Sequence, residues 1–139
     1  MTLRVPLVKG RFMTLISAYA PTLVADDAAT DRFYDDLYRD LRSVPRSDKL
    51  FLLGDFNARV GAYYHVWGDI IGKHGVGNVN SNGLRLLNIC SEFDFIVTNI
   101  IFQQQNQLKT TWICIPDPTT GIYWTVVVRR SDQQDVLLT

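Results

Sequence analysis

The residues best suited to chemistry follow the apolar run LFLL at positions 50–53. Gly54 ends this run, Asp55 comes next, and Asn57 lies two residues beyond Asp55. Side chains two residues apart on a strand point to the same face, about 6 to 7 Å apart along it. The end of a buried strand that presents a carboxylate and a carboxamide together is where phosphodiester chemistry would be placed. The alternative is structural, because Asp and Asn also favour the turns that follow strands.

Tyr19 lies at the end of a second strand-like run. Residues 11–20, RFMTLISAYA, are rich in types that suit a buried strand, and Pro21 ends the run. We therefore expect Tyr19 near the carboxyl end of that strand. A partly buried aromatic residue that packs in the core is the competing interpretation.

The spacing of apolar residues predicts alternating strands and helices. Phe33, Leu37 and Leu41 recur every four residues, which is typical of an amphipathic helix, with Thr30 as its N-cap. Alternating strands and helices favour an α/β layered domain. The other expected elements are a strand at 49–53, a Gly-rich loop at 57–82 with a short strand at 69–71, a helix at 84–93, a strand at 95–99, and a terminal hairpin formed by runs at 110–115 and 122–130.

Three further polar residues have structural alternatives to a functional role. Asn82 precedes an apolar helical run, so an N-cap at Ser81 or Asn82 is favoured over substrate contact. His65 and His74 lie in the Gly-rich loop without a supporting carboxylate pattern. Solvated histidines are therefore favoured over a metal-binding or general-base role.

Length and composition limit the class of protein. The 139 residues, 47% of them hydrophobic, suffice for one core, so we expect a single domain over residues 1–139. The 14 Lys and Arg residues balance 14 Asp and Glu residues, so any contact with nucleic acid must come from a local site. Cys90 and Cys114 fit neither a dense disulfide framework nor a zinc pattern. They indicate reduced, buried or partly buried thiols.

Neither a targeting segment nor a membrane segment is evident in the sequence. No apolar run approaches the length of about 18 residues that a membrane span needs. We expect no membrane partner and a soluble, intracellular chain. No block of basic residues marks nuclear import, so the choice between nucleus and cytoplasm stays open.

Six motifs follow one another along nearly the whole chain and together carry a family resemblance. The chain resembles the endonuclease/exonuclease/phosphatase family, and most closely the endonuclease domain of LINE-type non-LTR retrotransposons and the related craniofacial development protein 2-like sequences. GDFN alone is moderately specific, whereas the ordered series indicates common ancestry. The motifs are SAYAPT (17–22), DRFYDDL (31–37), KLFLLGDFNARVG (49–61), IGKHGVG (71–77), NSNGLRLL (80–87) and the Thr111-Trp112 pair.

The resemblance implies a four-layered α/β sandwich, with two packed mixed sheets flanked by helices, and a retroelement-derived DNA endonuclease that depends on Mg²⁺ or Mn²⁺. It implies that Asp55 orients or deprotonates the attacking water and binds the metal, and that Asn57 donates a hydrogen bond to a phosphoryl oxygen. Tyr19 matches a tyrosine that contacts the phosphate in relatives. Asn82 and Trp112 are weaker candidates for substrate contact, and core packing is the alternative for Trp112.

The family pattern is incomplete in this sequence. Relatives carry an early asparagine and a metal-binding glutamate before the strand that matches residues 11–20, and they end in a Ser-Asp-His segment; neither has a match here. An ungapped match places Tyr123, Trp124 and Thr125 where relatives have Ile-Asp-Tyr, whose aspartate positions the catalytic histidine. We therefore expect a domain that is incomplete at both ends. Its hydrolysis is expected to be impaired or absent, because catalytic residues that act as a unit fail together.

Two hypotheses of different classes follow. The first is a fragment of a metal-dependent DNA endonuclease. The second is a catalytically dead remnant, or a domesticated binding or scaffold module, that keeps the α/β core; a small-molecule phosphatase is a weaker third. In an incomplete sandwich, exposed sheet faces and strand edges would favour self-association.

Overall fold

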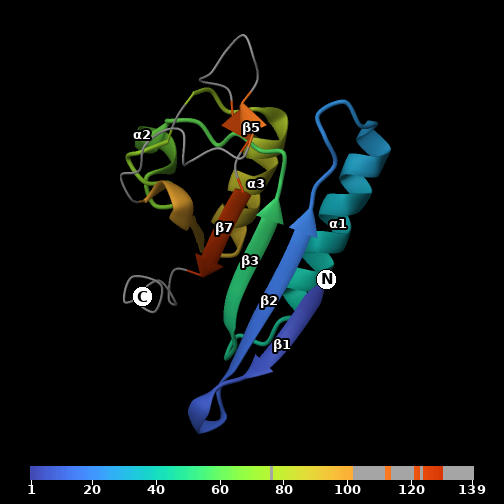
Figure 1. The fold of residues 1–139 in the computed structure, drawn as a ribbon, viewed down its shortest axis with the longest axis vertical. Helices are drawn as coiled ribbons and strands as arrows, with labels where there is room; N and C mark the ends of the chain where they lie inside the picture. Colours follow the sequence, from blue (N-terminus) through green and yellow to red (C-terminus); the bar gives the residue numbers. More distant parts are fainter. Residues whose placement is uncertain (76, 102–111, 114–120, 123, 130–139) are drawn as a thin grey trace.

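The chain forms a mixed sheet with helices, as the computed structural model shows (Figure 1). The structure describes residues 1–75 and 77–101, and beyond these only the backbone of residues 112–113, 121–122 and 124–129. Its elements are β1 (Thr2–Pro6), the 3-10 helix η1 (Val8–Gly10), β2 (Phe12–Tyr19), α1 (Asp27–Ser43), β3 (Lys49–Asp55), α2 (Tyr64–Trp67), α3 (Ser81–Glu92), β4 (Phe95–Val97), the 3-10 helix η2 (Thr98–Ile100), β5 (Trp112–Ile113), β6 (Gly121–Ile122) and β7 (Trp124–Arg129).

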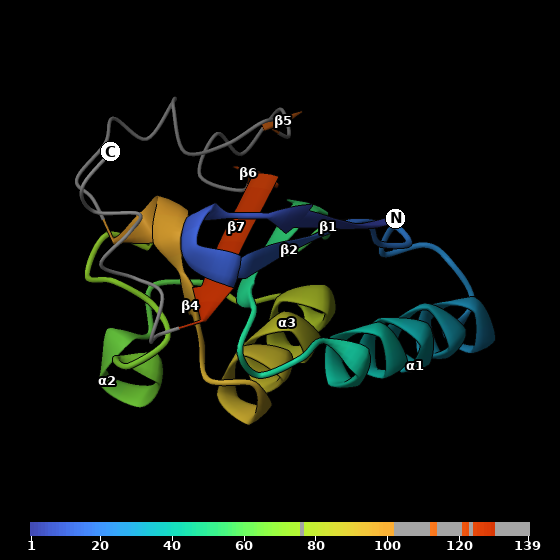
Figure 2. The ribbon, with the colours of Figure 1, turned by 90° about the horizontal axis from the view of Figure 1, so that it is seen from below.

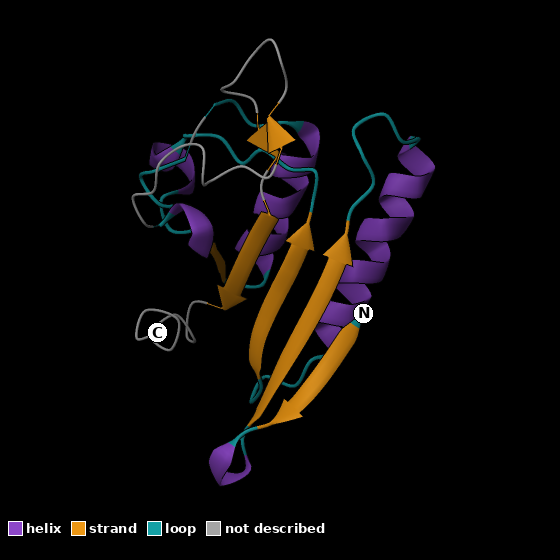
Figure 3. Ribbon diagram, viewed as in Figure 1, coloured by secondary structure: helices purple, strands orange, loops and turns teal. Residues whose placement is uncertain are grey.

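Five strands form the main sheet, in the order β1-β2-β3-β7-β4 (Figure 3). Strands β2 and β3 are parallel, and the other neighbours are antiparallel. The expected terminal hairpin is confirmed in part, because β5 pairs with β6 in a separate two-stranded sheet. Strand β7 instead enters the main sheet between β3 and β4. The remaining positions of the two predicted hairpin runs lie outside the described residues.

Helices α1 and α3 lie on one face of the main sheet (Figure 2). Alternate residues of the central strands are buried against them, because successive side chains on a strand point to opposite faces. The α/β architecture expected from the sequence is confirmed. The fully buried core residues include Ile16 on β2, Leu50 and Leu52 on β3, and Leu86, Leu87, Ile89 and Cys90 on α3.

Both long helices begin earlier than the apolar spacing predicts. Helix α1 has Asp26 as its N-cap, and the Asp26 side chain accepts a hydrogen bond of 2.6 Å from the Ala29 amide, so the prediction of Thr30 as N-cap is wrong. The two alanines of the first turn carry no amphipathic signal, although they favour helix. Helix α3 is capped by Asn80 rather than by Ser81 or Asn82.

Other local differences arise where the apolar pattern is short. The loop at 57–82 contains the one-turn helix α2, and the predicted strand at 69–71 reduces to a single bridge between Ile71 and Val97. Strand β4 ends at Val97 and is followed by η2. The strand β1 was not predicted: its polar and apolar side chains alternate only over residues 2–5, and four of its five residues are exposed.

A charged cluster holds β1 against the centre of the sheet. The Arg4 guanidinium of β1 donates to both carboxylate oxygens of Asp48, at 2.6 and 3.0 Å, and the Thr14 hydroxyl of β2 donates to the same carboxylate at 2.9 Å. Asp48 is 2% exposed and directly precedes β3. The hydrogen bond from Arg4 is the main reason that the pKa of Asp48 lies below its ordinary value.

Within the described part of the chain, no helix combines the length and the apolar character needed to cross a membrane.

Candidate functional site

Strands β2 and β3 are parallel, and their carboxyl ends lie side by side (Figure 1). Tyr19 and Asp55 are the last residues of these strands. They are register partners, and paired residues on adjacent strands lie on the same face of a sheet. Ile16 and Leu52 face the helices, so Tyr19 and Asp55, each an odd number of residues further on, face the opposite side. Tyr19 is 71% exposed and Asp55 is half-buried. The structure therefore brings these two predicted residues together at an open edge.

Gly54 lets β2 and β3 approach closely just before this edge. Its φ is +149°, and a Cβ built there would stand 1.8 Å from the Ala18 carbonyl oxygen. The Ala20 amide then donates to the Asp55 carbonyl oxygen at 2.8 Å. The two strands thus stay joined up to the point where the candidate side chains emerge.

Asn57 forms a tight turn with Asp55. Its backbone amide donates to Asp55 Oδ1 at 2.9 Å, and its φ is +47°, a left-handed value that Asn tolerates better than most residues. Its carboxamide is buried and donates through Nδ2 to the Ala20 carbonyl oxygen at 2.8 Å. Asp55 Oδ2 and the second Nδ2 hydrogen of Asn57 have no partner among the described residues. Asp55 is half-buried and Asn57 is 6% exposed, so the carboxylate is the more accessible of the two groups.

Asn82 joins the same loops from the first turn of α3. It is 3% exposed, and its Nδ2 donates to the carbonyl oxygens of Pro21 at 2.9 Å and Phe56 at 3.3 Å. These carbonyls follow β2 and β3. The predicted substrate-contact residue thus lies next to the candidate site, where its amide nitrogen binds the protein backbone.

Asn80 is a central residue that the sequence analysis did not single out. Its Oδ1 accepts hydrogen bonds from the amides of Gly83, at 2.7 Å, and Arg59, at 3.0 Å, and its Nδ2 donates to the Asn57 carbonyl at 3.2 Å. A Cβ at Gly83 would stand 1.8 Å from the Arg59 carbonyl oxygen. The Asn80-x-x-Gly83 spacing, with the capping residue three positions before the glycine, is the signal that could have identified it.

Helix α1 reaches this region through Tyr34. The Tyr34 hydroxyl donates to the Asn82 carbonyl at 3.4 Å, and the Arg85 guanidinium lies 5.3 Å from the centre of the tyrosine ring. Burial raises the pKa of Tyr34 to about 12. Both long helices are therefore tied to the loops that carry Asp55 and Asn57.

The other predicted residues lie away from Tyr19 and Asp55 or outside the described part of the chain. His65 is exposed on α2, as expected for a solvated histidine, and His74 is partly buried. Trp112 belongs to β5, and its side chain lies outside the described residues. Cys90 is a buried free thiol, as expected, whereas Cys114 is outside the described part.

Asp55 is the candidate metal ligand, and the described side chains around it do not complete a metal site. Across residues 1–75 and 77–101, no three His, Cys, Asp or Glu side chains lie close enough together to hold an ion. Mg²⁺ prefers several oxygen ligands and is usually held by one or two carboxylates plus substrate phosphates. Asp55 would therefore depend on ligands beyond this group.

Two curated proteins are similar to this chain. Craniofacial development protein 2 of Bos taurus is 40% identical over 100 residues, and that of Tragulus javanicus is 38% identical over 100 residues. Each match covers 72% of this chain and 17% of the relative, so the matched region spans about a sixth of the curated proteins. No family model matches the chain.

Proposed function

We propose that this chain is part of a retroelement-derived DNA endonuclease of the endonuclease/exonuclease/phosphatase family, and that its own phosphodiester hydrolysis is impaired. The observation that carries the proposal is the pairing of exposed Tyr19 with Asp55 at the carboxyl ends of two parallel strands. The ordered motifs from SAYAPT to NSNGLRLL support the family and the retroelement origin. The similarity to craniofacial development protein 2 supports a shared ancestry with those relatives.

We assign a role in hydrolysis to each of Asp55, Tyr19 and Asn57. Asp55 Oδ2 would accept a hydrogen bond from the attacking water and take its proton. The Tyr19 hydroxyl and the second Nδ2 hydrogen of Asn57 would donate to phosphoryl oxygens as their negative charge increases. The backbone hydrogen bonds of Asn57 and Ala20 would keep these donors and the carboxylate in one place.

Mg²⁺ or Mn²⁺ is part of this proposal, with Asp55 as the residue that would bind it. When bound, such an ion would polarise the phosphate. Asp55 Oδ1 already accepts the Asn57 amide, and the described residues supply no cluster of further ligands. We therefore expect weak metal binding, which is one reason to propose impaired hydrolysis.

The proposed family fold is a four-layered α/β sandwich, of which this sheet and its helices would be one half. The support comes from the sheet face opposite the helices. Leu15, Phe51 and Leu53 on this face are only partly buried. A second layer would bury them further.

The second candidate function is a binding or scaffold module without cleavage. The observation that favours it is the burial of Asn57 and Asn82, whose amide nitrogens bind backbone carbonyls and thereby serve the structure. Such a module would keep an exposed Tyr19 for contact with DNA. It would also keep the exposed edge strand β1, through which we propose self-association.

The test is nicking of supercoiled plasmid DNA by the purified chain with Mg²⁺ or Mn²⁺, alongside an EDTA control. We expect slow, metal-dependent nicking that falls by at least about a hundredfold in Asp55→Asn, which removes the proposed base and keeps an acceptor for the Asn57 amide. Asp35→Asn, an exposed change on α1, is the matched control.

The outcomes separate the two candidates. Nicking that Asp55→Asn abolishes and Asp35→Asn preserves would support the endonuclease. Plasmid binding that Tyr19→Ala weakens, with no nicking by the unmodified chain, would support the binding module. A folded chain that neither binds nor nicks DNA would refute both.

A further inference from the structure

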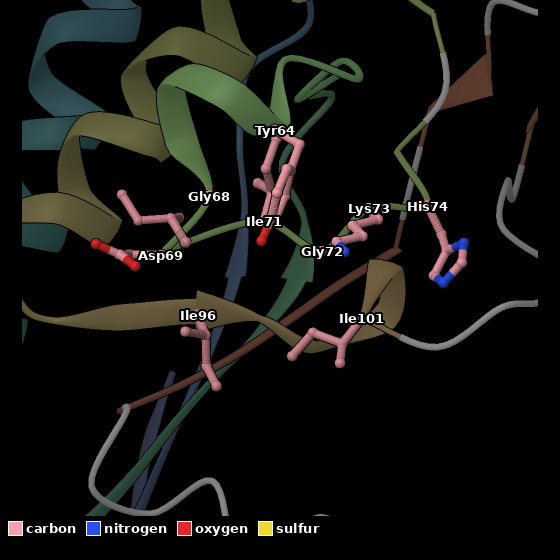
Figure 4. Close-up of a pocket in the computed structure, with 10 residues that line it drawn as sticks. Tyr64, Gly68, Asp69, Ile71, Gly72, Lys73, His74, Ile96 and Ile101 are labelled. Carbon is pink, nitrogen blue, oxygen red and sulfur yellow. The ribbon is translucent and has the colours of Figure 1, made fainter.

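A pocket that neither Tyr19 nor Asp55 lines is present beside β4 (Figure 4). Its volume is about 420 Å³, within the range of sites that bind small molecules. Tyr64 at the start of α2 and residues 68–74 form one wall, and Ile96 of β4 and Ile101 after η2 form the other. The lining residues include Tyr64, Gly68, Asp69, Ile71, Lys73 and Ile96.

An apolar floor and an aromatic ring give the pocket a surface for a flat ligand. Ile71 and Ile96 are 2% and 5% exposed, so the floor is fixed by the core, while the Tyr64 side chain reaches the solvent. A Cβ at Gly68 would stand 2.8 Å from the Tyr64 carbonyl oxygen and 3.5 Å from Cε2 and Cζ of its ring. Glycine therefore permits a close approach to the Tyr64 backbone, and it also leaves this side of the ring without a side chain.

The positive and negative side chains that line the pocket lie at opposite ends of it. The Lys73 ammonium lies 5.6 Å from the centre of the Tyr64 ring, within the range of a cation–π contact. His74 neighbours Lys73, whereas Asp69 lies at the opposite end of the group of lining residues (Figure 4). An anionic group of a ligand would therefore bind at the Lys73 end.

We propose that this pocket binds a nucleoside monophosphate unit, with the base stacked on Tyr64 and the phosphate beside Lys73. An aromatic ring next to a cation is the combination that single-stranded nucleic-acid sites use, because every base offers a π face. The choice of a nucleotide over other flat anions rests on the proposed function. The unit could be a free nucleotide or an unpaired nucleotide within a DNA strand, since both present the same chemistry.

Calorimetric titration of the full chain with deoxyadenosine monophosphate in EDTA tests the proposal without any cleavage. We expect binding that Tyr64→Ala weakens by about tenfold, the lower part of the range for loss of one stacked base. Tyr64→Phe keeps the ring and should retain binding. Lys73→Gln should weaken binding by several-fold, whereas Lys9→Gln, in the exposed η1 segment, should not.

The competing outcomes are distinct. No binding of deoxyadenosine monophosphate by folded chain, or equal binding of deoxyribose 5-phosphate without a base, would overturn the proposal. Equal affinity of Tyr64→Phe and Tyr64→Ala would also overturn it, and Tyr64→Leu repeats the test if the alanine variant does not fold.

Stronger binding of a ten-nucleotide single strand than of its duplex or the mononucleotide would identify a strand as the source. Similar binding of strand and mononucleotide would identify the free nucleotide. These results do not depend on whether the chain nicks plasmid.

Discussion

The side chain of Asn80 makes three hydrogen bonds, which join the start of α3 to the loop that follows β3. Two of these bonds, to the Arg59 amide and the Asn57 carbonyl, fix the chain immediately after Asp55. The third caps the helix through the Gly83 amide. The Asn80 carboxamide therefore caps the start of α3 and also holds the turn that follows Asp55.

We expect Asn80→Ala to lower the free energy of unfolding by about 2 to 3 kcal/mol, because it removes an N-cap worth about 1 kcal/mol and leaves the Arg59 amide and Asn57 carbonyl without their partner. Asn80→Asp should cost less, since it keeps the acceptor. Urea unfolding measures both. Asn78→Ala, two positions earlier, serves as the control: it loses only an exposed hydrogen bond of 3.3 Å from the Tyr63 hydroxyl and should change stability by no more than about 0.5 kcal/mol. Equal effects of Asn80→Ala and Asn78→Ala would contradict this role.

Gly54→Ala should be among the most disruptive single changes in the chain. The new methyl group would overlap the Ala18 carbonyl at a backbone angle that side chains avoid, so we expect a loss of about 3 kcal/mol or more. Gly10→Ala, with φ of +69° and no atom within 4 Å of the new Cβ, should cost about 1 to 2 kcal/mol from its backbone angle alone. Chemical denaturation of the two variants gives the comparison. A Gly54→Ala protein as stable as Gly10→Ala would show that β2 and β3 are not this close.

At the residue scale, the sequence indicated Asp55, Asn57 and Tyr19 because each follows a recognisable apolar run. The structure places them together, and their catalytic roles stay predictions. Asn80 was not predicted, because its partners Asn57 and Arg59 are more than 20 residues away and no local pattern shows that the segments meet.

At the scale of elements, α1 and β3 were predictable because their buried positions recur at the helical and strand periods. Strand β1 was not, because its alternation of polar and apolar side chains covers only Thr2 to Val5, and the strand is held by pairing with β2 and by Arg4. The place of β7 between β3 and β4 was also beyond local patterns. It depends on pairing between segments far apart in the chain.

The Arg4–Asp48 contact predicts a pH dependence of stability. A carboxylate with a lowered folded-state pKa stabilises the fold above its ordinary value of 3.8, and this contribution is lost as the pH falls through the lowered pKa. We therefore expect the free energy of unfolding of Asp48→Asn to lie below that of the unmodified chain at pH 7, and the difference to shrink below pH 3.8. Urea unfolding at a series of pH values measures it, with Asp35→Asn as control. A difference that stays constant down to acid pH would rule out the ion pair as its source.

At the scale of the whole molecule, one edge of the main sheet is formed by β1. Leu3 on this strand is 52% exposed, and an edge strand with exposed apolar side chains is open to pairing with another chain. We expect concentration-dependent self-association in light scattering after gel filtration. Leu3→Lys should reduce it, because a charge on an edge strand opposes such pairing. A monomer at all concentrations would contradict the proposed self-association.

The buried thiol of Cys90 gives this fold an internal reporter. Its side chain is fully buried on α3, and burial raises its pKa, so the reactive thiolate is scarce while the helix stays packed. In a Cys114→Ser background, a thiol reagent should modify Cys90 only during transient separation of α3 from the sheet. Asn80 caps this helix and also holds the turn that carries Asp55. The modification rate would therefore report how often α3 separates from the sheet in a protein that is otherwise native.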